Sequence, residues 1–483
     1  MSWLRKYNTI ADAFNGAKLF PVILLLFLVI VVSYVVTTWI IHGDPTHPYT
    51  WLIFLVFAIL LAAPIIISIA LKKFDPLAPI MLWIAMYGFL YFARPIALIS
   101  KNETFTLGNE FLNRALLIAI LGLICFYLGY YWDIGTRIAK HIPVIKKEIS
   151  TRKLILTAFV FIAIGFWGLN DYIQTSGGWL KFWSKPHGYG GLAINTTAYI
   201  YQLPELMVSG FFLVFAALIY KKFCRKMKFF TIKNTLILIA ASIGGVGIYT
   251  ILWASRTMYS WVLIFMVTIY FLIKQTRPRL KTLIIMILVL YFVVALVPTT
   301  RAFLYLGSNM TFSKFFENYL RDVLLKPFGG GASDEFNVYL AETALVPEIV
   351  PYDYFNLYLR LIVHPIPRLL WPTKPAFLNS QWDNLISKMN IYIGSSETML
   401  GDFYAQWGIT AVIIGTIFSG IFWRTIYEYV SQNKGNFSVA VIYAVMLPNM
   451  ITYLAQMPTI AILKWLPYIL PSTIIALIIS RKK

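Results

Sequence analysis

The sequence predicts an all-α polytopic membrane protein with about twelve transmembrane helices and one large extracytoplasmic loop. Three observations predict this class. Of the 483 residues, 59% are hydrophobic and 13% are charged, which is too little charge to cover a soluble protein of this size. Charge-free apolar runs such as Leu19–Ile41 are long enough to cross the hydrocarbon core of a bilayer. Basic residues gather in every second loop between such runs.

The apolar runs and the charged breaks between them place the helices along the chain. The predicted spans are 19–41, 49–71, 78–93, 111–132, 154–173, 197–220, 235–254, 257–273, 282–299, 402–423, 438–455 and 459–480. The first run is too long for a signal-peptide core, and no small-residue cleavage site follows it, so we interpret it as a retained helix. The spans divide the chain into a nine-helix membrane domain (1–299), the loop (300–401) and three C-terminal membrane helices (402–483).

The charge distribution predicts the orientation. With the N-terminus inside the cell, the segments on the cytoplasmic side carry the whole formal net charge of +21, and the charges on the outer side balance. This is the positive-inside bias, and it accounts for the basic character without a nucleic-acid partner. Both termini are therefore expected in the cytoplasm.

Cysteine, histidine and repeat patterns exclude several other classes. Cys125 lies within a predicted helix and Cys224 in a basic cytoplasmic loop, so we expect no disulfide between them. The five histidines are scattered without metal-ligand spacing, and no phosphate-binding glycine loop is present, so no metal or cofactor is expected. We find no internal repeat, which counts against transporters built from duplicated halves.

The segment 300–401 is far too long to be a simple connection, and loops of this length tend to be functional. Residues 318–325 and 349–362 mix aromatic, apolar and charged side chains as short amphipathic helices do. We therefore expect an ordered cap on the outer face, with its helices partly sunk into the membrane interface.

Two arginines stand where membrane helices meet the outer face. Arg256 lies between two predicted helices that almost no loop separates, which favours a cation at the floor of an outward cavity. Arg301 follows the ninth helix and opens the large loop. The alternative for both is an arginine that snorkels to the interface.

A second basic group lies further along the loop. Arg360 and His364 are four residues apart, so on a helix they share one face, and two prolines end that helix. Arg368 then follows in a stiff proline-rich turn near Trp371. Guanidinium and imidazole groups gathered there would suit a diphosphate and an attacking hydroxyl; the alternative is a solvated helix face. The carboxylates Glu342 and Asp402 are weaker candidates, for which ordinary salt bridges are the alternative.

The segment Pro365–Pro375, followed by Asn379 and Ser380, resembles the oligosaccharide repeat-unit polymerases, that is, the Wzy-like O-antigen and enterobacterial-common-antigen polymerase family. Three further elements are similar to that family, in a layout that covers most of the chain. They are Asp75–Pro79 at the start of the third helix, the small-Arg-small turn Ser255–Thr257, and the glycine-bearing re-entry Gly394–Gly408.

The resemblance implies a metal-independent glycosyltransferase with a GT-C-like membrane architecture in the bacterial inner membrane. Such an enzyme polymerises undecaprenyl-diphosphate-linked repeat units into a surface polysaccharide, with arginines stabilising the diphosphate leaving group on the outer side. Arg256 matches the turn arginine and Arg301 the arginine that opens the loop, whereas Arg360 and Arg368 match only loosely. His364 has no counterpart, and its assignment as general base rests on its near-neutral pKa, with Glu342 and Asp402 as reserves.

These considerations give a set of candidate residues and partners. The catalytic candidates are Arg256, Arg301, Arg360 and His364, and the substrate-binding candidates are Arg368, Trp371, Lys374, Glu342, Asp402 and Tyr404. The expected partners are the lipid-linked substrates and membrane lipid, together with a chain-length regulator and a flippase. Three alternatives stay open: a ligase-like glycan transferase, a lipid-linked oligosaccharide flippase with two comparable halves, and a structural subunit without catalysis.

Overall fold

The fold is known from a computed structural model. It describes residues 48–71, 73–100, 109–144, 148–175, 177–178, 203–229, 231–247, 256–279, 281–292, 313, 316–317, 335–363, 366, 370–373 and 397–481. In these residues every regular element is a helix, and one isolated bridge pairs Ile149 with Arg481.

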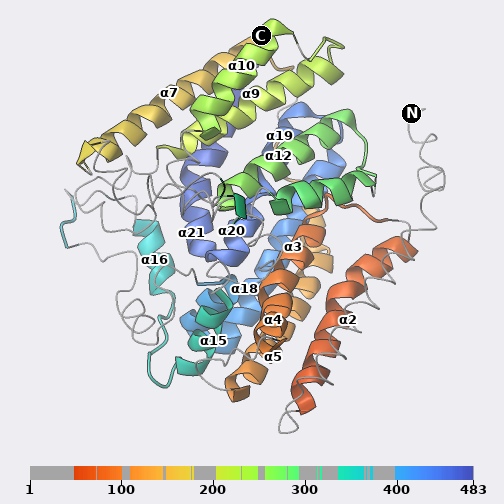
Figure 1. The fold of residues 1–483 in the computed structure, drawn as a ribbon, viewed down its shortest axis with the longest axis vertical. Helices are drawn as coiled ribbons and strands as arrows, with labels where there is room; N and C mark the ends of the chain where they lie inside the picture. Colours follow the sequence, from red (N-terminus) through yellow and green to blue (C-terminus); the bar gives the residue numbers. More distant parts are fainter. Residues whose placement is uncertain are drawn as a thin grey trace.

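The N-terminal helices form one side of the bundle (Figure 1). They are α2 (Pro48–Ala70), α3 (Pro79–Gly88), the π-helical turn η3 (Phe89–Ala93), α4 (Arg94–Ser100), α5 (Asn109–Tyr131) and α6 (Ile134–Ala139). Pro79 begins α3, where its missing N–H costs nothing because the first turn of a helix has no partner for that group. The π-helical turn lets α3 run on into α4 as one long rod.

The middle of the chain supplies a second group of helices. They are α7 (Thr151–Thr175), α9 (Glu205–Phe223), α10 (Ile232–Ser242) with the π-helical turn η5 (Ile243–Gly247), α12 (Arg256–Lys274) and the helix Lys281–Phe292. The Thr231 hydroxyl caps α10 by accepting from the backbone N–H of Asn234 at 3.2 Å.

The C-terminal part contributes the helices that join the two groups. They are α15 (Glu335–Leu345), α16 (Asn356–Val363), α18 (Met399–Gln432), α19 (Phe437–Met446), α20 (Asn449–Ala455), α21 (Pro458–Lys464), the π-helical turn η7 (Trp465–Ile469) and α22 (Leu470–Ile479).

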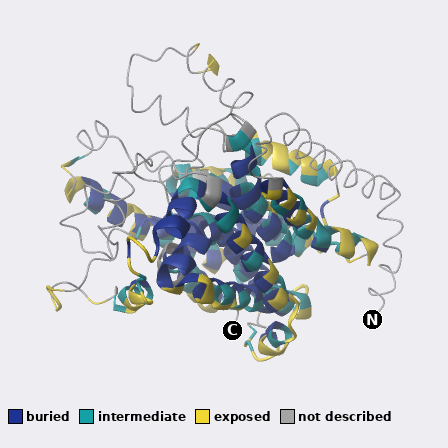
Figure 2. Cartoon of the chain, turned by 90° about the horizontal axis from the view of Figure 1, so that it is seen from below, coloured by how far each residue is buried: buried dark blue, intermediate teal, exposed yellow. Residues whose placement is uncertain are grey.

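The chain is a helical membrane protein, as the composition predicts. Among the described residues, seven helices are long and apolar enough to cross a membrane. They lie at Tyr49–Ala70, Pro79–Ala97, Phe111–Tyr131, Thr151–Thr175, Glu205–Phe223, Met399–Gln432 and Phe437–Ala455. Large apolar side chains such as Leu52, Ile59 and Ile67 on α2 point outward, and Figure 2 shows exposed residues along the outer helices around a buried centre. An apolar outer surface of this kind requires lipid around it.

The described helices differ from the predicted spans at several places. The first span, 19–41, lies outside the described residues. The spans predicted at 257–273 and 459–480 agree with α12 and with the continuous run of α21, η7 and α22. Of the spans predicted at 235–254 and 282–299, the described parts are the helices Ile232–Gly247 and Lys281–Phe292. The span predicted at 402–423 is α18, which begins earlier, ends later and is broken at Trp407 and Gly408. Hydrophobic periodicity cannot detect such a break because apolar residues continue on both sides of it.

The loop helices also differ from expectation. Residues 318–325 lie outside the described residues, and in the stretch 349–362 the helix α16 begins only at Asn356. The sequence did not predict α15, in which Phe336 and the residues from Val338 to Leu345 are buried. This part of the loop packs inside the bundle against α5 and α18 and is no surface cap.

The buried side chains form two main cores. The first core joins α2, α3, η3, α5, α15 and the N-terminal half of α18, and the second joins α7, α9, α12, α19, η7 and α22. Within the first core α5 and α18 lie very close, because Gly420 has no side chain: a Cβ there would lie 2.3 Å from the Phe126 carbonyl oxygen. Small residues at such crossings permit tight helix packing in membranes.

Candidate functional site

Two buried carboxyl groups of the first core lie at the N-terminal end of α18. Glu342 of α15 and Asp402 of α18 are both wholly buried. Ionisable groups inside an apolar bundle are costly, so they mark a functional site more often than a structural one. In Figure 1, α15 lies beside α18 and the neighbouring ends of α4 and α5.

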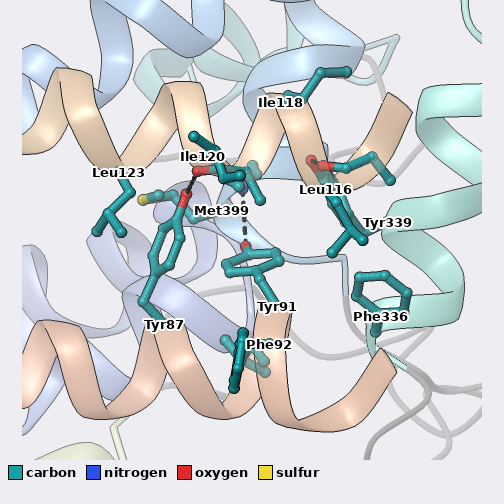
Figure 3. Close-up of a cluster of buried hydrophobic side chains, with 14 of the residues drawn as sticks. Tyr87, Tyr91, Phe92, Leu116, Ile118, Ile120, Leu123, Phe336, Tyr339 and Met399 are labelled. Carbon is teal, nitrogen blue, oxygen red and sulfur yellow. Dashed lines mark hydrogen bonds between the residues drawn. The ribbon is translucent and has the colours of Figure 1, made fainter. Parts of the chain in front are cut away.

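A layer of tyrosines fixes these elements to one another (Figure 3). Tyr87 donates to the Ala119 carbonyl oxygen at 2.6 Å, and Tyr339 of α15 donates to the Ala115 carbonyl oxygen at 2.7 Å. The hydroxyl oxygen of Tyr91 accepts from the backbone N–H of Leu400 at 3.3 Å. Each tyrosine therefore ties two helices together, and the position of α15 against α5 and α18 is well defined.

Asp402 is wholly buried and holds two donors. Its Oδ2 accepts from the Tyr358 hydroxyl at 3.1 Å, and its Oδ1 accepts from the Gln406 Nε2 at 3.2 Å. Tyr358 belongs to α16, so this contact joins the large loop to α18. Burial, followed by the nearby charge of Asp402, raises the pKa of Tyr358, and this phenol therefore acts as a donor at neutral pH.

Glu342 is also wholly buried, and its two carboxylate oxygens have no hydrogen-bond partner among the described residues. Burial raises the pKa of Glu342 well above the usual glutamate value, and the charges of Glu397 and Asp402 raise it further. The carboxylate occupies the space that a side chain at residue 401 would need: a Cβ on Gly401 would lie 1.5 Å from Glu342 Oε2. Glycine at 401 is therefore a requirement of this arrangement.

The break in α18 lies one turn beyond Asp402. Trp407 has ψ of 38° and Gly408 has φ of 60°, so residues 399–406 form a separate short helix. The carbonyl oxygens of Ala405 and Gln406 at its end accept from the backbone N–H groups of Asp353 and Tyr354, both at 2.9 Å. The loop segment before α16 thus supplies the donors that the broken helix lacks.

A guanidinium group borders the site. Arg114 of α5 donates to the Tyr404 hydroxyl, and its guanidinium lies 5.7 Å from the centre of the Tyr404 ring. The Tyr404 hydroxyl in turn donates to the Val346 carbonyl oxygen at 3.4 Å. Arg114 is half-buried, so it can present a fixed positive charge beside Tyr404, two residues from Asp402 in the chain.

The structure brings together three residues that the sequence singled out: Glu342, Asp402 and Tyr404. Arg360 is half-buried on α16, two residues beyond Tyr358, and Trp371 is exposed, donating to the Thr373 hydroxyl at 3.2 Å. Other candidates cannot be placed. Arg301, His364, Arg368 and Lys374 lie outside the described residues, and of Arg256 only the backbone at the start of α12 is described.

Sequence reasoning missed Arg114, Tyr358 and Gln406. Arg114 could have been found, because it is a charge at the outer end of a predicted span. Tyr358 and Gln406 carry no such signal, since a tyrosine or glutamine at an interface is ordinary. Across the described ranges, no group of three or more His, Cys, Asp or Glu side chains is placed to hold a metal ion.

Comparison of the chain with known protein families, with curated proteins and with solved structures finds no significant match.

Proposed function

We propose that this protein is a membrane glycosyltransferase that polymerises undecaprenyl-diphosphate-linked oligosaccharide repeat units on the outer side of the bacterial inner membrane. The observation that carries the proposal is the position of Arg114, Glu342 and Asp402 at one end of an apolar bundle, where segments of the large loop contact Tyr404 and Asp402. The resemblance of Pro365–Pro375 and of the Ser255–Thr257 turn to the repeat-unit polymerases supports the same reaction.

The proposed reaction transfers the growing glycan to a fresh repeat unit. The O–H bond of an acceptor sugar hydroxyl breaks as its oxygen bonds the anomeric carbon. The bond from that carbon to the diphosphate breaks, and its electron pair stays on the phosphate oxygen. The leaving group needs positive charge. Arg114 joins Arg256, Arg301, Arg360 and Arg368 as a source of that charge.

The proton of the attacking hydroxyl needs an acceptor. A carboxylate within hydrogen-bond reach can serve, and Asp402 is the buried carboxyl to which Tyr358 of the loop helix α16 donates. Release of Tyr358 when substrate binds would free one oxygen of Asp402 for the incoming hydroxyl. His364 remains the other candidate for this role.

The decisive experiment is polymerisation in vitro. The purified protein in lipid receives a lipid-diphosphate repeat unit with a chelator present, and the products are separated on a gel. The proposal predicts a ladder that Arg256→Ala, Arg360→Ala and Arg114→Ala abolish, while a ladder that persists in His364→Ala assigns the base to Asp402. Transfer to an unrelated acceptor without a ladder would instead indicate a glycan ligase.

One observation favours a second candidate, a lipid-linked oligosaccharide flippase. Broken membrane helices with buried carboxyls are typical of ion-coupled transporters, and α18 is broken next to Asp402. The readout that separates the two is movement of the lipid-linked substrate across the bilayer of a vesicle without any change in its glycan length.

A further inference from the structure

The carboxyl of Glu342 is the most unusual group in the described part of the chain. It is wholly buried, and neither oxygen has a hydrogen-bond or ion-pair partner among the described residues. Natural proteins rarely bury a carboxyl without partners, so one left in this state indicates a ligand or a role.

None of the described basic side chains is among the charges that act on this carboxyl. η3, α5 and α18 pack against α15. At this end of the bundle these elements and the residues beside them carry the titratable and charged groups Tyr91, Arg94, Arg114, Tyr339, Glu397, Asp402 and Tyr404. Arg114 donates to Tyr404, and the charges that act on Glu342 come from Glu397 and Asp402. Among the described groups, the charges that influence Glu342 are therefore negative.

Three states of the carboxyl can be compared. An ionised Glu342 would have no donor and would lie close to two other acidic groups, which burial makes costly. A bound Ca²⁺ or Mg²⁺ ion would need about six oxygen ligands, yet both oxygens of Asp402 already accept from Tyr358 and Gln406. Gly401 also packs directly against Glu342 Oε2, which leaves no space on that side. A bound proton removes the charge and needs no additional space.

We propose that Glu342, with Asp402 beside it, is a proton-binding site, and that the bound proton holds α15 against residues 399–406 of α18. The ligand is a proton, and its uptake makes the contact between α15 and residues 399–406 of α18 depend on the surrounding pH. The raised pKa of Glu342 determines the direction of this pH dependence. The contact is fully present below the ordinary glutamate pKa of about 4.3 and is lost as the pH rises through the raised pKa.

Hydrogen exchange of residues 399–406, measured in lipid nanodiscs from acidic to alkaline pH and corrected for intrinsic rates, tests the proposal without any substrate. In the unmodified protein we expect protection to fall at alkaline pH. In Glu342→Gln, whose amide carries no charge, protection should persist across the range. Glu348→Gln, the same substitution at an exposed position in the segment after α15, should behave like the unmodified protein.

Three outcomes would overturn the proposal. They are protection that is independent of pH in the unmodified protein, the same pH dependence in Glu342→Gln, and protection that follows sodium concentration at fixed pH, which would indicate a cation site. An infrared spectrum of the unmodified protein gives a reading that does not depend on the variant. A protonated-carboxyl band must persist above the pH at which ordinary carboxyl groups ionise, and its absence there contradicts the proposal. None of these readouts involves polymerisation, so the proposed function stands or falls separately.

Discussion

The carboxyl groups at the two ends of α18 have opposite surroundings. At the C-terminal end, Asp75 is 18% exposed and satisfied: Tyr427 donates to it at 2.9 Å, the Leu77 N–H donates at 3.1 Å, and Arg277 forms an ion pair at 3.6 Å. At the N-terminal end, Asp402 holds two neutral donors, and Glu342 has no partner among the described residues. A carboxyl that accepts hydrogen bonds and pairs with a cation stabilises the fold, whereas a buried carboxyl without such partners more often marks a functional site.

The distance between the two ends matches a membrane crossing. Asp402 and Tyr427 are separated by roughly 35 Å at a rise of about 1.5 Å per residue, slightly more than a hydrocarbon core. Basic residues gather at the Asp75 end, where Arg424 pairs with Glu428 at 2.6 Å and Arg277 reaches the Phe74 carbonyl oxygen. The charge distribution predicts that this end faces the cytoplasm, which would put Glu342 and Asp402 at the outer face.

The largest effect is expected from Gly401→Ala. The new Cβ would overlap Glu342 Oε2, so α15 and α18 must separate at a cost of about 3 kcal/mol or more. Thermal unfolding in nanodiscs measures the loss. The matched control is Gly88→Ala in α3, where the nearest atom lies at 3.5 Å and the change should be neutral or slightly stabilising.

A double-mutant cycle sharpens that result. In a Glu342→Ala background the space next to residue 401 is open, so Gly401→Ala should cost at least ~1 kcal/mol less than it does alone. An equal cost in both backgrounds would show that the two residues do not touch.

The next effect is expected at the other end of the helix. Asp75→Ala removes the acceptor of the Tyr427 hydroxyl and the Leu77 N–H, which should cost roughly 1–3 kcal/mol. Arg277 is half exposed, so solvent screens its ion pair, and Arg277→Ala should cost less than about 1 kcal/mol. If chemical denaturation shows the same loss of unfolding free energy in both variants, the ion pair accounts for the whole contribution of Asp75. The interpretation of Asp75 as a stabilising hydrogen-bond acceptor would then be wrong.

Glu342→Gln should be neutral or slightly stabilising at neutral pH, in contrast to Asp75→Ala. Because the pKa of Glu342 is raised, the unmodified protein should lose stability as the pH rises. The variant has no titratable group at this position, so at alkaline pH it should be more stable than the unmodified protein. Melting temperatures of both proteins across pH measure this. Parallel curves would mean that Glu342 does not titrate in that range.

The smallest effect is expected from Tyr358→Phe. The change removes one of two donors to Asp402 and should cost about 0.5–1.5 kcal/mol. Hydrogen exchange of α16 should rise while that of α19 stays constant, because α19 does not share this contact. Unchanged exchange in α16 would show that the bond does not hold the loop.

The sequence predicted the class and most of the spans because apolar length reports membrane crossing directly. It also predicted Glu342, Asp402 and Tyr404 as candidates, although with salt bridges as the default for the carboxyls. It could not predict that α15 is buried, because burial of nine of its eleven residues depends on contacts with α5 and α18 far away in the chain. The break at Gly408 likewise depends on donors from Asp353 and Tyr354, a long-range pairing without a local signature.

We propose that the N-terminal end of α18 is the site of the proposed reaction and that the C-terminal end only supports the fold. Polymerisation of a lipid-diphosphate repeat unit, compared at equal amounts of folded protein for Arg114→Ala, Asp402→Asn and Asp75→Asn, tests it most directly. We predict that the first two variants lose the ladder while Asp75→Asn retains it. A ladder that survives both Arg114→Ala and Asp402→Asn, or that disappears only in Asp75→Asn, would contradict the claim.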